Sequence, residues 1–107
     1  MGQFRKKMDP ELKAKWLKAL RSGDYQQSKF TLRDARGHCC LGVLCDIVDP
    51  DAWRTDETHT TGWGNRHYNQ VRGFPFLTDN QSVRLSYLND KNDLSFEQIA
   101  VFIEEEL

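Results

Sequence analysis

The most regular pattern in the chain is a row of apolar residues at helical spacing near its N-terminus. The apolar residues recur at helical spacing, and lysines and an arginine occupy the remaining faces of the helix. The apolar residues are Leu12, Trp16, Leu17 and Leu20. Asp9 precedes them as a favoured N-cap residue, and Pro10 suits the first helical position. Gly23 follows them and suits a left-handed C-cap. The pattern predicts an amphipathic helix from Pro10 to about Ser22.

A second helical pattern occupies the C-terminal part of the chain. Ser95 and Gln98 have the spacing of a capping box, and Leu94 with Ile99 has the spacing of a hydrophobic staple. We therefore expect a helix that begins at Phe96 and buries one apolar face: Phe96, Ile99, Ala100, Phe102 and Ile103. A polar turn over residues 89–93 separates it from a shorter predicted helix that carries Val83, Leu85 and Leu88.

The densest apolar run lies between these helices and contains all three cysteines. Helical spacing relates Leu41, Leu44, Cys45 and Val48, whereas alternation relates Cys39, Leu41, Val43, Cys45 and Ile47, as in a strand. We favour the helix because it leaves Asp46 and Asp49 on a wetter side. Gly42 would allow another element to approach closely, and Pro50 ends the helix.

The remaining segments carry weaker signals. The segment from Tyr25 to Arg33, which carries Phe30, Thr31 and Leu32, predicts a short strand, and the turn-forming residues 34–37 that follow suggest a hairpin. Residues 50–80 lack strong periodicity and predict an irregular loop region. We expect one α+β domain over residues 1–107, with three or four helices on a short antiparallel sheet or irregular β layer. Residues 1–8 are predicted to be a flexible N-terminus.

Composition and charge narrow the function classes. The 107 residues suffice for one modest core, and 38% hydrophobic with 29% charged residues is typical of a folded chain. No stretch approaches the roughly 20 apolar residues of a membrane span, so we expect no membrane partner. Residues 1–33 carry a formal charge of +6 and residues 34–107 one of −7. This asymmetry either steers a charged partner or docks the first helix on the rest of the chain.

The cysteines and their neighbour His38 offer candidate chemistry. Adjacent cysteines on a helix point about 100° apart, so Cys39, Cys40 and Cys45 do not match the spaced pairs of structural zinc sites. Cys39 beside His38 is the one candidate nucleophile, but apolar neighbours raise a thiol pKa and make it inert. We therefore expect a cluster of buried, reduced thiols and neither a metal ion nor another cofactor.

A resemblance to a known family rests on several of these segments. They are residues 18–23, Tyr25 with Gln27, Leu32-Arg33, the cysteine block over residues 39–46, Leu88-Asn89-Asp90, Ser95-Phe96 and Ile99-Ala100. Together they resemble a family of small proteins of tailed bacteriophages and prophages that has no established activity. The resemblance implies no catalytic residue. It implies a phage accessory protein in the cytoplasm of a bacterial host, where host takeover and evasion of host defence are common functions.

The irregular region supplies the candidate binding residues. Its aromatic and arginine side chains are of the types that dominate binding hot spots: Trp63, Arg66, His67, Tyr68 and Arg72. The leading hypothesis is a non-enzymatic protein that uses them to inhibit or redirect a host protein. The alternative is a small-molecule or nucleotide-binding protein that sequesters a signalling ligand. Equally open is the interpretation that Trp63 and Phe74 fold inward to complete the core. Nucleic acid is the weaker partner class, because a pI near 6.3 offsets the basic N-terminal region.

Overall fold

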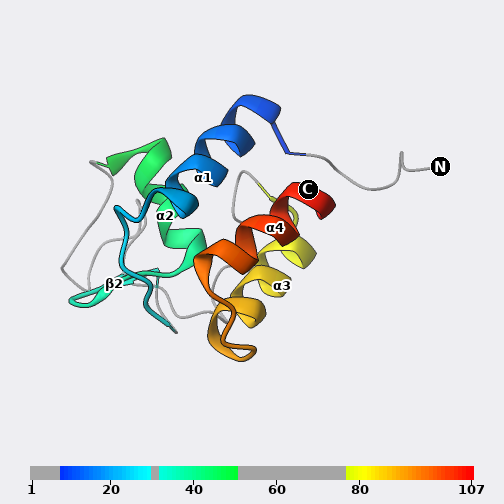
Figure 1. Cartoon of the computed structure of the whole chain (residues 1–107). Coiled ribbons are helices and arrows are strands. Elements are labelled where there is room, and N and C mark those ends of the chain that lie inside the picture. Colours follow the sequence, from blue (N-terminus) through cyan, green and yellow to red (C-terminus); the bar gives the residue numbers. More distant parts are fainter. Residues whose placement is uncertain (1–7, 30–31, 51–76) are drawn as a thin grey trace, which may run out of the picture.

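The computed structural model describes residues 8–29, 32–50 and 77–107 (Figure 1). Its elements in chain order are α1 (Pro10–Ser22), β1 (Arg33–Asp34), β2 (Gly37–His38), α2 (Cys40–Val48), α3 (Asp79–Asp90) and α4 (Phe96–Glu106). The two strands pair antiparallel, with Arg33 opposite His38 and Asp34 opposite Gly37. Within the described residues, four helices packed with this small sheet confirm the predicted α+β class.

Helix α1 follows its sequence signals closely. The Asp9 carboxylate accepts a hydrogen bond from the Leu12 amide at 2.9 Å, and Gly23 ends the helix in the left-handed region at φ 83°. Trp16 and Leu20 are buried on its apolar face, and the Trp16 indole nitrogen donates to the Cys40 carbonyl oxygen at 2.9 Å. The predicted helix is confirmed, and this bond joins it to the start of α2.

The charge asymmetry of the chain is used where α1 packs against α4. The Lys13 ammonium donates to the Glu104 carbonyl oxygen at 3.2 Å, and the Arg21 guanidinium pairs with the Glu104 carboxylate at 3.0 Å. Carbonyls at a helix C-terminus carry partial negative charge, so cations are stabilising there. Docking of the basic helix on the acidic part of the chain therefore accounts for two of its charges.

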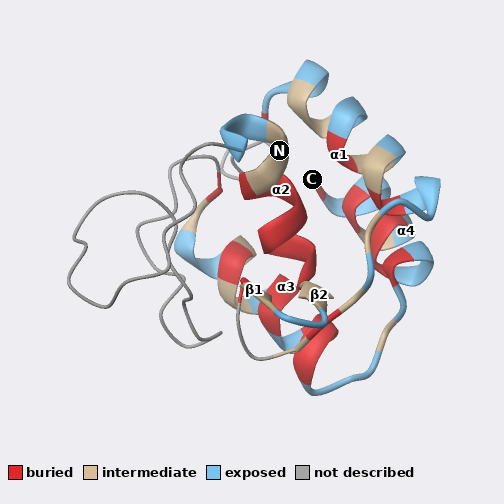
Figure 2. Ribbon diagram, turned by 90° about the vertical axis from the view of Figure 1, so that its left-hand side faces the viewer, coloured by how far each residue is buried: buried red, intermediate tan, exposed pale blue. Residues whose placement is uncertain are grey.

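Helix α2 lies at the centre of the fold, and its first turns are buried on all sides (Figure 2). The choice of helix over strand for the cysteine run is confirmed. The predicted burial of Val48 is wrong, since this residue is 36% exposed. Burial changes along the axis of α2, from the enclosed residues 40–45 to the exposed residues 48–50, and does not follow one face.

Gly42 provides the close approach that its position predicted. A Cβ atom at Gly42 would lie 1.8 Å from the carbonyl oxygen of Leu32, well inside any real contact. The chain segment that leads into the hairpin thus passes directly over α2. A hydrogen bond from the Cys39 amide to the same Leu32 carbonyl, at 3.1 Å, fixes this crossing.

Helix α3 is longer than predicted. Thr78 and Gln81 form a capping box that starts the helix at Asp79, so the predicted irregular region ends earlier than residue 80. The helix runs through Asp90, which makes it 12 residues long against 11 in α4, and the predicted turn over 89–93 begins only at Lys91. Serine and asparagine side chains occupy several of its buried positions, which weakened the apolar signal.

Helix α4 confirms the predicted capping box. The Gln98 amide donates to Ser95 Oγ at 3.2 Å, and the Ser95 amide donates to Gln98 Oε1 at 2.9 Å. The predicted face is buried except for Phe102, which is half-buried with the Arg84 guanidinium 5.8 Å from its ring centroid.

Met8 is buried in the core, so the N-terminal boundary predicted at residue 8 is corrected. None of the helices in the described ranges is long and apolar enough to cross a membrane.

Candidate functional site

The predicted binding residues belong to a segment outside the description. Trp63, Arg66, His67, Tyr68 and Arg72 all fall within residues 51–76. The structure describes the points where this segment leaves and rejoins the core. It follows α2, and it leads into Leu77, which is buried directly before the Thr78 cap of α3. Helices α2 and α3 pack against each other, so the segment joins two elements that are in contact.

The three thiols are sealed inside that core, which confirms the predicted cluster. Cys39 is the N-cap of α2, where its sulfur accepts a hydrogen bond from the Gly42 amide at 3.4 Å. The Cys40 thiol donates to the Leu85 carbonyl oxygen at 3.6 Å. Burial raises the pKa of the Cys39 thiol to about 12 and that of Cys40 well above its usual value. Both sulfurs are therefore protonated at neutral pH and unsuited to nucleophilic attack.

A second polar cluster joins the hairpin to α2. The Tyr25 hydroxyl donates to Asp46 Oδ2 at 2.6 Å, and the His38 ring lies edge-on to the Tyr25 ring at 5.1 Å. Burial, reinforced by the Asp46 bond, raises the pKa of Tyr25 to about 12. Burial lowers the pKa of His38, although Asp46 opposes the shift. The neutral Tyr25 hydroxyl donates its proton in the hydrogen bond to Asp46. The cluster therefore links the residues before the hairpin to α2 and does not supply a general base.

Asn89 is the centre of a buried hydrogen-bond network that the sequence did not predict. Its Oδ1 accepts from the Gln27 side chain at 2.9 Å and from the Cys40 amide at 3.3 Å. Its Nδ2 donates to the Ser28 carbonyl oxygen and to Asp90 Oδ1, both at 2.8 Å. Gln27 in turn donates to the Leu94 carbonyl oxygen at 2.7 Å. The network ties the hairpin approach, α2, α3 and the loop before α4 to one side chain.

One sequence signal points to the place of Asn89 in the core. It follows the buried Leu85 by four residues, and residues four apart share a helix face. Gln27 gives no such signal, because it lies outside regular structure and its partners are more than sixty residues away along the chain.

In the described ranges, no group of three or more His, Cys, Asp or Glu side chains is arranged to hold a metal ion.

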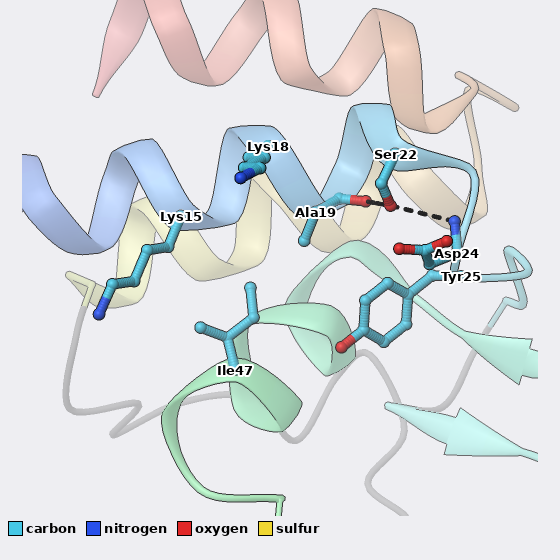
Figure 3. Close-up of a pocket in the computed structure, with 7 residues that line it drawn as sticks. All are labelled: Lys15, Lys18, Ala19, Ser22, Asp24, Tyr25 and Ile47. Carbon is cyan, nitrogen blue, oxygen red and sulfur yellow. Dashed lines mark hydrogen bonds between the residues drawn. The ribbon is translucent and has the colours of Figure 1, made fainter.

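A surface pocket of about 290 Å³ opens between α1 and α2 (Figure 3). Ala19 of α1, Ile47 of α2 and the Tyr25 ring give it an apolar floor, and Lys15 and Lys18 line it from α1. Ser22 and Asp24 complete the rim at the end of α1. The pocket thus combines aliphatic and aromatic surface with two cations.

The two pocket lysines differ from the other cations of α1. Lys13 and Arg21 bind Glu104 of α4, whereas Lys15 and Lys18 are exposed and have no hydrogen bond or ion pair with any described residue. The Ser22 hydroxyl and the Asp24 amide of the rim are occupied. Ser22 Oγ donates to the Ala19 carbonyl oxygen at 2.7 Å and accepts from the Asp24 amide at 3.0 Å. The lysine ammonium groups are the hydrogen-bond donors that this rim leaves available to a ligand.

A known protein family matches this chain. A model described as "Domain of unknown function (DUF8296)" matches residues 8–74. The chain belongs to this family. No curated protein and no solved structure matches the chain.

The DUF8296 match divides the fold in an informative way. It includes α1, the hairpin, α2, the whole lining of the α1–α2 pocket and the five predicted binding residues, while α3 and α4 lie beyond it. Asn89 lies outside the matched residues yet bonds Gln27, Ser28 and Cys40 within them. In this DUF8296 protein, the hydrogen bonds of Asn89 therefore link α3, which lies beyond the match, to the matched residues.

Proposed function

We propose that this protein is a non-enzymatic binding protein that engages a protein of a bacterial host and inhibits or redirects it. The observation that carries the proposal is the burial of the thiol cluster, since Cys39 was the candidate nucleophile of the chain. A protonated thiol enclosed in a core does not attack a substrate. The resemblance to phage proteins supplies the context of a host cytoplasm.

Candidate recognition residues remain when this chemistry is set aside. The segment 51–76 carries tryptophan, tyrosine and arginine, the residue types enriched in binding hot spots. Its attachment to the packed helices α2 and α3 supports the assignment, because these helices place its two ends on one core. We propose that Trp63 and Tyr68 are central contacts, with Arg66, His67 and Arg72 beside them.

The test is capture of the partner by the tagged full chain in bacterial cells, with reversible cross-linking and quantitative mass spectrometry. We expect one protein to be recovered in stoichiometric amount by the wild type. Recovery should be lost with Trp63→Ala/Tyr68→Ala and kept with Tyr87→Ala, a matched truncation of an aromatic residue that is 52% exposed on α3. Absence of any enriched protein, or equal recovery by a folded double variant, would overturn the proposal.

Native and denatured mass spectra of the untagged protein test the small-molecule alternative. A mass excess found only in the native spectrum would show a bound ligand and replace the proposed function with ligand sequestration. A clean subunit mass would support a macromolecular partner.

A further inference from the structure

Two lysines of the α1–α2 pocket, Lys15 and Lys18, have no hydrogen bond or ion pair with any described residue. Lys15 and Lys18 lie three residues apart on one face of α1, and both line the pocket. Of their neighbours, Arg21 pairs with the Glu104 carboxylate, and Lys13 donates to the Glu104 carbonyl oxygen. An acidic group is the matching occupant of the pocket.

The charge of the pocket selects among acidic ligands. Two lysines and the Asp24 carboxylate give the lining a formal charge of +1. A single carboxylate is matched by this charge, whereas a nucleotide polyphosphate would bring several negative charges close to Asp24. The Asp24 amide in the Ser22–Asp24 turn already bonds Ser22 Oγ and is not available to a phosphate, which agrees with this choice.

The size and floor of the pocket select further. Sites for drug-sized ligands are about 300–1,000 Å³, and this pocket of about 290 Å³ lies just below that range. Ala19, Ile47 and the Tyr25 ring offer apolar contact for a side chain with no charge. A peptide that places an aliphatic residue beside an acidic one satisfies both the floor and the rim.

We infer that the α1–α2 pocket is the docking site for an acidic segment of the partner protein. A glutamate or aspartate carboxylate of that segment lies between Lys15 and Lys18, and a neighbouring aliphatic side chain packs on Ile47. This inference rests on the proposed function and adds the chemistry of the partner and a contact surface separate from residues 51–76.

The test is a titration of the isotope-labelled full chain, followed by amide NMR, with a capped peptide of alternating leucine and glutamate. Saturable shifts are expected at Lys15, Lys18, Tyr25 and Ile47, together with weaker binding at higher ionic strength. The same peptide with glutamine in place of glutamate should bind roughly fivefold more weakly. Two exposed ion pairs correspond to a roughly fivefold loss of affinity in the Lys15→Gln/Lys18→Gln variant.

The matched control removes two cations from other elements. Arg36→Gln/Lys91→Gln has the same change in net charge, affects the hairpin turn and the end of α3, and should leave the affinity unchanged. Equal binding of the glutamine peptide, equal loss in both variants, or no shifts at the pocket would overturn the inference. Tighter binding of ATP or inorganic phosphate than of the peptide at the same residues would also overturn it, in favour of a small anion.

The partner captured by the tagged chain separates this inference from the function on which it rests. A partner whose recovery is unchanged in Lys15→Gln/Lys18→Gln overturns the pocket assignment and leaves the proposed function standing. A partner lost in this variant and retained in Arg36→Gln/Lys91→Gln supports both.

Discussion

Truncation of Asn89 to alanine removes the side chain that links four parts of the fold. Two of its partners are buried backbone groups, the amide of Cys40 and the carbonyl oxygen of Ser28. The Cys40 amide is at the first position of α2, where no helical carbonyl is available to it. Gln27 keeps its bonds to the Leu94 carbonyl oxygen and the Phe96 amide. The variant therefore leaves two buried backbone groups unsatisfied, and Asp90 Oδ1 loses its bond to Asn89 Nδ2.

Each buried group left without a partner costs about 1–3 kcal/mol. We therefore expect Asn89→Ala to lower the free energy of unfolding by about 2–6 kcal/mol. Domains of this kind have a total stability of about 5–15 kcal/mol, so the loss is a large fraction of the whole. It exceeds what the truncated volume alone would produce, because asparagine contributes little apolar surface.

Urea unfolding followed by circular dichroism measures this loss as a lower midpoint at an unchanged slope. Asn92→Ala is the matched control, since Asn92 is exposed in the turn directly after α3 and its substitution should change stability by less than about 0.5 kcal/mol. A loss below about 1 kcal/mol for Asn89→Ala would refute the reasoning. It would mean that water replaces the side chain or that the network is not formed.

Three further predictions follow from the same structure. Gly42→Ala should destabilise the fold by about 1–3 kcal/mol or more in the same urea assay, because its Cβ would meet the Leu32 backbone. The three cysteines should resist alkylation in the native protein at neutral pH and react once it is unfolded, as mass spectrometry would show. The pKa of Tyr25 is raised to about 12 in the folded state, so the neutral phenol favours folding. Its contribution is complete below pH 10 and is lost as the pH rises from 10 to about 12, which phenolate absorbance and unfolding at each pH would report.

Each of these predictions has a control and a contradicting result. Gly23→Ala meets no neighbouring atom but is strained at φ 83°, so it should cost only about 1 kcal/mol; equal losses at both glycines would contradict the role of close contact at Gly42. Rapid modification of one cysteine in the native state would reopen the enzymatic hypothesis. Tyr25→Phe keeps the ring and should remove part of the alkaline pH dependence, and an unchanged profile would contradict the assignment to Tyr25.

The parts of the fold that depend on neighbours along the chain were predictable. Asp9, Gly23 and Ser95 act within four residues of their own positions, so the ends of α1 and the start of α4 follow from local chemistry. Burial that depends on distant elements was predicted less well. Val48 has the spacing of a core residue but lies at the end of α2 that other elements do not cover.

The candidate sites show the same limit. Nothing in the local sequence separates Lys15 and Lys18 from Lys13 and Arg21, because the distinction arises from which side of α1 meets α4. The hydrogen-bond network around Asn89 depends on partners that lie 49 to 62 residues away along the chain. Polar side chains become core residues here through long-range geometry, which periodicity does not encode.

The packing of α1 against α4 has a consequence for synthesis on the ribosome. The Trp16–Cys40 bond spans 24 residues, but the Lys13–Glu104 contact spans 91. Chains are made at about 5–20 residues per second, so α1 waits roughly 5–18 s after its own emergence before α4 can cover it. The nascent chain can close α1 onto α2 early, whereas the face of α1 that meets α4 stays uncovered until α4 has been translated.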